Sequence, residues 1–164
     1  MRAVAHSSSI IHPAKVPAFW RLLKATFTEV VIPTAVSEEI LRGKEIGSPD
    51  VPVIEGSIRE GWIRVSGAPP IAGIPENLGR GEEEAIALMR QEQADWLLMD
   101  DLVASRAARL LGMEVRPVVY LLIYWTRKAG TGKDSAIELL DELVNTGYRL
   151  SVRDYLAIKD MIQG

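Results

Sequence analysis

Four acidic positions, Glu39, Glu82, Asp100 and Asp101, fall where an apolar pattern begins or changes. Asp100 and Asp101 directly follow the apolar run Trp96 to Met99, which has the length and composition of a buried strand. Residues that follow a strand of a parallel sheet lie at the edge where ligands bind. Clustered carboxylates repel one another unless a cation or a proton relieves them, so the set predicts a divalent metal site. Metal-assisted hydrolysis of a phosphodiester is the leading chemistry.

Each acid also has a purely structural explanation. Glu82 lies four residues before Ile86, on the apolar side of a predicted helix, but an acid in a first helical turn also offsets the helix dipole. Asp is a preferred N-cap, so one of the pair Asp100 and Asp101 is expected to cap or orient the next helix while the other faces a cleft. Glu39 precedes Ile40 on the apolar side of another predicted helix.

The elements that must position these acids alternate between strand and helix patterns. We expect strands over 2–5, 30–32, 63–65, 96–99 and 115–119, and polar turns or loops over 7–9 and 68–79. We expect helices over 17–27, 34–42, 81–93 and 103–111, a short helix over 54–59, an apolar helix ending near 124, and two C-terminal helices that begin after Thr131 and Ser151. This alternation predicts one domain, residues 1–164, with a parallel sheet covered on both faces.

Composition narrows the class of protein. With 164 residues, 48% hydrophobic and 25% charged, the chain is globular in composition. The absence of cysteine excludes disulfides, thiolate metal sites and a cysteine nucleophile. The longest apolar run, Val118 to Trp125, is too short to span a bilayer, and the first residues lack the apolar region of a signal peptide, so we expect a cytoplasmic protein. A net charge of −3 neither predicts nor excludes a nucleic-acid partner.

Four sequence blocks together resemble the PIN-domain family of metal-dependent ribonucleases, in the subgroup related to toxin ribonucleases. The resemblance covers nearly the whole chain, and the spacing of the blocks agrees with the family. The blocks are Val4 to Ile11, Ile32 to Ile40, Gly81 to Leu88, and Leu97 to Asp101 with the helix that follows through Arg106 to Gly112.

The resemblance implies a three-layer α/β/α sandwich whose acids hold Mg²⁺ or Mn²⁺ and activate water to attack single-stranded RNA. Glu39, Glu82 and Asp101 match the family's later acids, with Asp100 as a neighbouring ligand or orienting group. By position, Ser8 matches a hydroxyl of the family's first motif, and Arg106 is placed to reach a phosphate. We further expect a homodimer and an antitoxin protein as partner.

One position departs from the family pattern. The family places a metal-binding aspartate at the end of the first strand, where this chain has His6. A neutral imidazole lacks the charge of a carboxylate and disfavours Mg²⁺, whereas Mn²⁺ or Zn²⁺ tolerates nitrogen. Either His6 joins the metal ligands of a site that prefers such a metal, or the site is degenerate.

Two functions therefore follow from the sequence. The first is a metal-dependent ribonuclease, the toxin of a toxin–antitoxin pair. The second is a catalytically degenerate domain of the same fold that binds RNA or a protein. A small phosphatase or nucleotide-binding protein is a third class, but the chain lacks a phosphate-binding loop.

Overall fold

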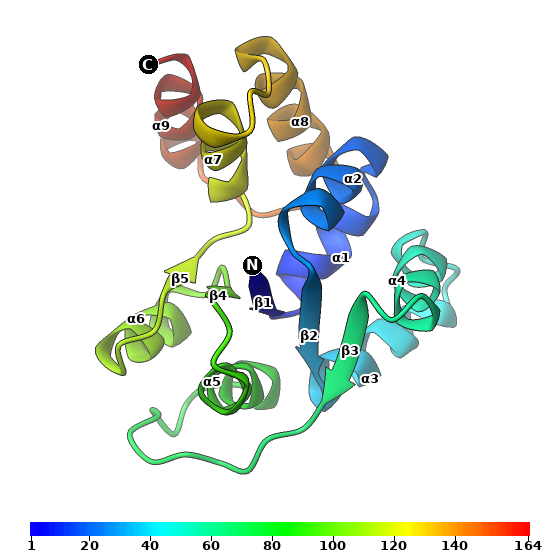
Figure 1. The fold of residues 1–164 in the computed structure, drawn as a ribbon, viewed down its shortest axis with the longest axis vertical. Coiled ribbons are helices and arrows are strands. Elements are labelled where there is room, and N and C mark those ends of the chain that lie inside the picture. Colours follow the sequence, from blue (N-terminus) through cyan, green and yellow to red (C-terminus); the bar gives the residue numbers. More distant parts are fainter.

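The computed structural model describes the whole chain, residues 1–164, as five strands and nine helices (Figure 1). The strands are β1 (Arg2–Ala5), β2 (Glu29–Pro33), β3 (Ile63–Ser66), β4 (Trp96–Leu98) and β5 (Val115–Arg116). The helices are α1 (Ser8–Ala14), α2 (Pro17–Thr26), α3 (Thr34–Lys44), α4 (Asp50–Arg59), α5 (Arg80–Glu92), α6 (Leu102–Leu110), α7 (Tyr120–Lys128), α8 (Lys133–Asn145) and α9 (Val152–Gln163). None of these helices has the length and hydropathy needed to cross a membrane.

All five strands run parallel, in the order β3-β2-β1-β4-β5. The chain builds one half of the sheet outward from β1 through β2 to β3, then returns to the other side of β1 for β4 and β5. The carboxyl ends of β1 and β4 therefore flank the topological switch point, where open parallel sheets bind ligands. His6 follows β1 at this point, and its backbone N–H donates to the carbonyl of Leu98 at 3.0 Å.

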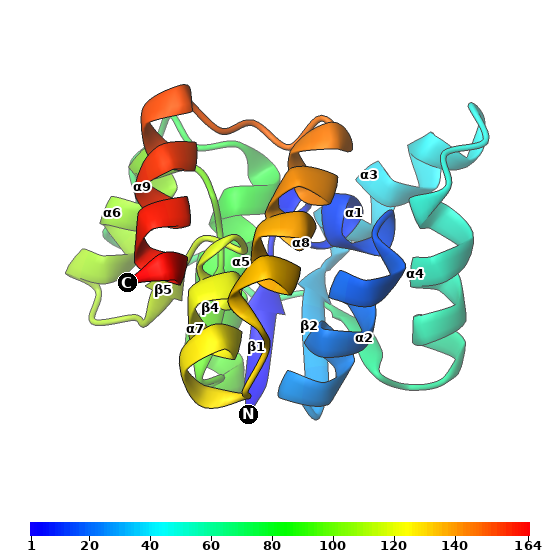
Figure 2. The ribbon, with the colours of Figure 1, turned by 90° about the horizontal axis from the view of Figure 1, so that it is seen from above.

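Successive strand residues point into two separate cores, as the two-residue period of a strand requires. Ala3 and Ala5 of β1 and Ile32 of β2 face the larger core, whereas Val4 and Val31 face the smaller one. The larger core is completed by α1, α2, α3, α4, α7, α8 and α9, and the smaller one by α5 and α6 (Figures 1 and 2). The predicted three-layer α/β/α sandwich is thus confirmed.

Three boundaries differ from the sequence prediction for local reasons. The segment 7–9, expected as a turn, starts helix α1 at Ser8. Helix α3 was expected to end before Gly43, but it continues to Lys44. Gly43 lies where α3 packs against α4, since a Cβ there would lie 3.4 Å from Val51. Strand β5 stops at Arg116, because Pro117 has no N–H with which to continue a ladder.

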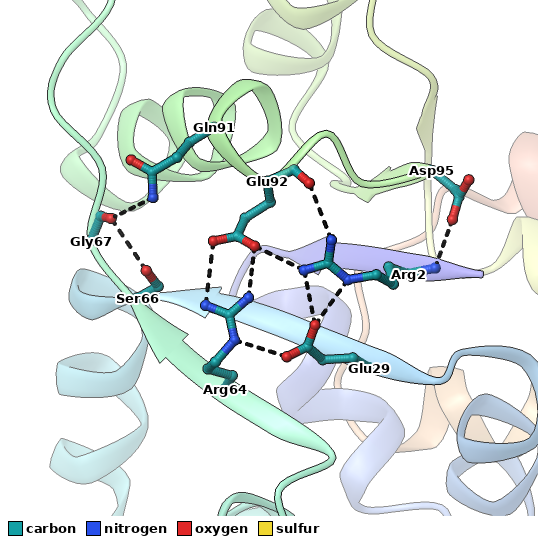
Figure 3. A network of polar contacts seen from close by, with 8 residues as sticks. All are labelled: Arg2, Glu29, Arg64, Ser66, Gly67, Gln91, Glu92 and Asp95. Carbon is teal, nitrogen blue, oxygen red and sulfur yellow. Dashed lines mark hydrogen bonds and ion pairs between the residues drawn. The ribbon is translucent and has the colours of Figure 1, made fainter.

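Two arginines and two glutamates form an ion-pair network at the amino edge of the sheet (Figure 3). Arg2 of β1 pairs with Glu29 of β2 at 2.9 Å and with Glu92 of α5 at 2.8 Å. Arg64 of β3 pairs with the same two carboxylates at 2.8 and 2.6 Å. Hydrogen bonds from Arg64, and then from Arg2, hold the pKa of both carboxyls below their usual range. The network ties three strands to the last turn of α5.

A single carboxylate, that of Asp100, joins the C-terminal helices to the opposite edge of the sheet. Its Oδ2 accepts from the Ser8 and Ser9 hydroxyls at 2.8 and 2.9 Å. Its Oδ1 accepts from the Val118 N–H at 3.2 Å and from the Tyr148 hydroxyl at 2.5 Å. Burial, together with the nearby Asp100 charge, raises the pKa of Tyr148, so this hydroxyl remains a proton donor.

Glu92→Gln tests the network at the amino edge. The variant loses a carboxylate whose side chain is only 13% exposed, so we expect the free energy of unfolding at pH 7 to fall by about 1–2 kcal/mol. A depressed carboxyl pKa stabilises the fold above the unfolded-state pKa and loses that effect as the pH falls through the folded-state pKa, so the difference should shrink below about pH 4. Urea unfolding across this range measures it. Glu60→Gln, which breaks an exposed pair with Lys24, is the matched control, and an equal loss there would contradict the role of the network.

Tyr148→Phe tests the Asp100 anchor. The variant removes one of four donors from a half-buried carboxylate, so we expect a loss of about 1–3 kcal/mol in urea unfolding. The control is Tyr155→Phe, which removes a hydroxyl that donates to the exposed Asp141 and should cost less. Equal losses would show that the Tyr148 hydroxyl is not an anchor.

Candidate functional site

A cavity of about 380 Å³ opens at the carboxyl ends of β1 and β2, and we call it the His6 cavity. Its residues come from the end of β1, from α3 and from the start of α5. They are His6, Ser7, Ala35, Glu38, Glu39, Arg42, Gly79, Arg80, Gly81 and Glu82. The lining is almost entirely polar, which suits a charged ligand better than an apolar one.

His6 and Glu82 form the centre of this cavity. His6 Nε2 lies 3.5 Å from Glu82 Oε1, and their side chains are 12% and 20% exposed. Glu82 is the third residue of α5, where the free backbone N–H groups of a helix start favour a negative charge. The helix start thus favours the charge of Glu82, whose carboxylate lies beside the imidazole.

Two glycines make room for this pair. A Cβ at Gly81 would lie 3.1 Å from His6 Nε2, which is tighter than an ordinary contact. A Cβ at Gly79 would overlap Glu82 Oε2. In the sequence, the visible signal for this crowded helix start is Gly81 directly before three successive acids, with Gly79 two residues earlier.

Helix α3 supplies the other charged wall of the cavity. Glu38, Glu39 and Arg42 are exposed side chains on this helix, and all three line the cavity. Arg80 of α5 crosses to α3 and pairs with Glu38 at 2.8 Å, while it also pairs with Glu84 at 2.9 Å. Arg42 has no hydrogen bond or ion pair within the chain, so it is free to contact an anionic ligand.

The other predicted site residues lie outside the His6 cavity. Asp100 is the anchor described above, and Ser8 is one of its donors. Asp101 is exposed and is the N-cap of α6, where its Oδ1 accepts from the Ala104 N–H at 2.8 Å. Arg106 is exposed on α6. Glu39, Glu82 and His6 therefore line one cavity. The four residues that lie elsewhere are Ser8, Asp100, Asp101 and Arg106.

The arrangement does not fit a bound metal ion. No group of three His, Cys, Asp or Glu side chains is close enough together to hold one. Asp100, which the sequence suggested as a ligand or an orienting group, already accepts four hydrogen bonds from protein donors. What remains is an imidazole beside a carboxylate, with an unpaired guanidinium, Arg42, on the same cavity.

Two solved structures resemble this fold. A PilT N-terminus domain protein from the hyperthermophilic archaeon Sulfolobus solfataricus P2 is 24% identical, with 72% of this chain and 87% of that chain covered and a TM-score of 0.49. A domain of a functionally unknown protein from Methanocaldococcus jannaschii is 16% identical, with 71% and 89% covered and a TM-score of 0.50. At these identities the likeness concerns the fold alone.

Comparison with curated proteins gives no match. A family model described as "DUF3368: PIN domain" matches residues 2–163, which is nearly the whole chain. The chain belongs to the PIN-domain family.

Proposed function

We propose that this chain is a ribonuclease that acts on single-stranded RNA at the His6 cavity. PIN domains are generally nuclease-like. The observation that carries the proposal is the convergence of His6, Glu39 and Glu82 in one polar cavity beside the switch point of the sheet. Three chain segments far apart in sequence supply these groups, as expected of an active site in a concave pocket.

The protein groups of the cavity divide into two roles under this proposal. Arg42 is unpaired and exposed, so it contacts the RNA backbone, with Arg80 beside it. His6 exchanges a proton with the RNA, and Glu82, 3.5 Å away, holds the ring in position. PIN domains typically use divalent metal ions, but the donors here do not form a three-ligand group, so these roles include no metal step.

The sequence resemblance extends this proposal. The resemblance implies Mg²⁺ or Mn²⁺ as the cofactor, and we further propose an antitoxin protein as partner, a homodimer as the assembly, and the cytoplasm as the location. Asp100 and Asp101 were predicted as catalytic. In this proposal they have structural roles at the carboxyl edge of the sheet, Asp100 as the anchor of the C-terminal helices and Asp101 as the N-cap of α6.

A second function is favoured by the absence of a three-ligand group. Under this alternative the domain binds RNA at the same cavity without cleaving it. The replacement of a metal-binding acid by His6, and the contact of His6 with Glu82, support the alternative. The two functions share the substrate and differ in whether a bond is broken.

Substitution of His6 by aspartate separates the two functions. We expect the natural protein to cleave a labelled single-stranded RNA weakly, and His6→Asp to raise Mg²⁺-dependent cleavage, because a carboxylate restores the hard oxygen donor that Mg²⁺ prefers. Glu82→Gln should abolish cleavage, and Glu45→Gln, at an exposed position outside the cavity, should leave it unchanged.

A chelator control exposes contaminating nuclease in this assay. Strong Mg²⁺-dependent cleavage by the natural protein, without gain in His6→Asp, would show that His6 is not the limiting departure. Cleavage by none of the variants, with RNA still bound, would establish the binding function instead.

Thermal unfolding tests metal binding independently of cleavage. We expect millimolar Mg²⁺ to leave the melting temperature of the natural protein unchanged, because no three-ligand group is present. For His6→Asp we expect an upward shift of about 2–4 °C for each kcal/mol of binding free energy. A clear shift of the natural protein with Mg²⁺ would mean that the carboxylates rearrange around the ion.

A further inference from the structure

A second cavity of about 400 Å³ lies beside the His6 cavity, between the connection 67–79 and the outer face of α5. We call it the loop cavity. Pro70, Ile71 and Ile74 of the connection and Ala87 of α5 form its apolar walls. Its volume is in the range of sites for small organic groups. The connection is also longer than most in compact domains, and such loops are usually functional.

Arg80 is the wall that the two cavities share. Its guanidinium is held by Glu38 on the side of the His6 cavity and by Glu84 on the side of the loop cavity. Glu84 is fixed in turn, because its other oxygen accepts from the Ala35 N–H at 2.9 Å. A chain of nucleotides that follows the carboxyl edge therefore passes from one cavity to the other over a fixed cation.

Two carboxylates of the loop cavity remain unused. Glu83, half-buried in the first turn of α5, and Glu76, exposed on the connection, have no hydrogen bond or ion pair within the chain. A carboxylate is an acceptor only, and its two oxygens can receive two parallel N–H donors. A cavity with apolar walls and a carboxylate acceptor at one edge fits a flat aromatic ring that carries N–H groups along one edge. Such a cavity repels a phosphate, which is left to Arg80.

We propose that the loop cavity binds one base of single-stranded RNA and selects guanine, with Glu83 accepting from the base N1–H and N2–H groups. The inference rests on the proposed function, because RNA at the His6 cavity brings a neighbouring nucleotide to this place. Glu83 stands on a helix and not on the connection, so its backbone is held by a rigid element.

Guanine follows from the hydrogen-bonding pattern of the bases. Its pairing edge presents two adjacent donors, which match both oxygens of one carboxylate. The corresponding edge of uracil presents one donor between two carbonyl oxygens, and those oxygens face the carboxylate unfavourably. Adenine and cytosine present a single amino group and are intermediate. Specificity of this kind arises from unpaired acceptors in the wrong complex as well as from good bonds in the right one.

Binding of two labelled RNAs tests the selection. One is an all-uridine nonamer and the other carries a single guanosine at its centre. Fluorescence anisotropy is measured in chelator, and a gel run after the measurement confirms that each RNA is still intact. We expect the natural protein to bind the guanosine RNA about tenfold more tightly. Glu83→Gln should lose that preference, because an amide replaces one acceptor with a donor. Glu45→Gln makes the same change of charge at an exposed site outside both cavities and should keep the preference.

Ile74→Arg is a second variant, for use if Glu83→Gln does not fold. Its longer side chain fills the loop cavity from the connection, so the preference for the guanosine RNA should again be lost. Equal affinity of the natural protein for the two RNAs would overturn the inference and leave the proposed function standing. The opposite case is a cavity that binds guanine in a protein that does not bind RNA. To test it, guanosine monophosphate and uridine monophosphate are each added alone, and the chemical-shift changes of the protein are measured. Guanosine monophosphate bound at residues of α5 without any RNA binding would keep the cavity and reject the RNA function, and no preference between the two nucleotides would reject the cavity.

Discussion

The Asp100 carboxylate decides how the carboxyl edge of the sheet is organised. Its four hydrogen bonds collect the start of α1, the segment between β5 and α7, and the connection between α8 and α9. These four donors offset the cost of removing the Asp100 charge from water. The C-terminal helices are thereby fixed to the sheet at the switch point. An acid committed to this task is not available to a ligand, so the open cavity lies on the β1–β2 side, at His6.

Helix α5 connects the amino edge of the sheet to the His6 cavity. Glu92 in its last turn is held by Arg2 and Arg64, and Glu82 in its first turn lies against His6. The same helix carries Arg80, Glu82 and Glu83 in its first turn, so the ion pairs at the amino edge hold a helix that lines both cavities.

Much of this could be predicted from the sequence, and the missing part has a physical cause. Apolar runs and helix signals gave the strands, most helices and the covered parallel sheet, because burial fixes those patterns. The place of Glu82 on an apolar stripe indicated that its side chain faces inward, and this side chain is 20% exposed. The hydrogen bond between Asp100 and Tyr148 could not be predicted, because it joins positions 48 residues apart. For the same reason, the loop cavity is invisible until the connection 67–79 is folded over α5.

His6 changes the electrostatics of the cavity more than its shape. With an aspartate at this position, the cavity would hold four carboxylates, with Glu38, Glu39 and Glu82, against two arginines. Such an excess of negative charge requires a cation. With His6, three carboxylates face two arginines. The cavity thus holds one carboxylate fewer than it would with an aspartate at this position, so less negative charge has to be offset by a cation from solution. An aspartate at position 6 would repel the Glu82 carboxylate, whereas the imidazole of His6 lies in contact with it. This explains how the cavity can keep its shape without a group of three metal ligands.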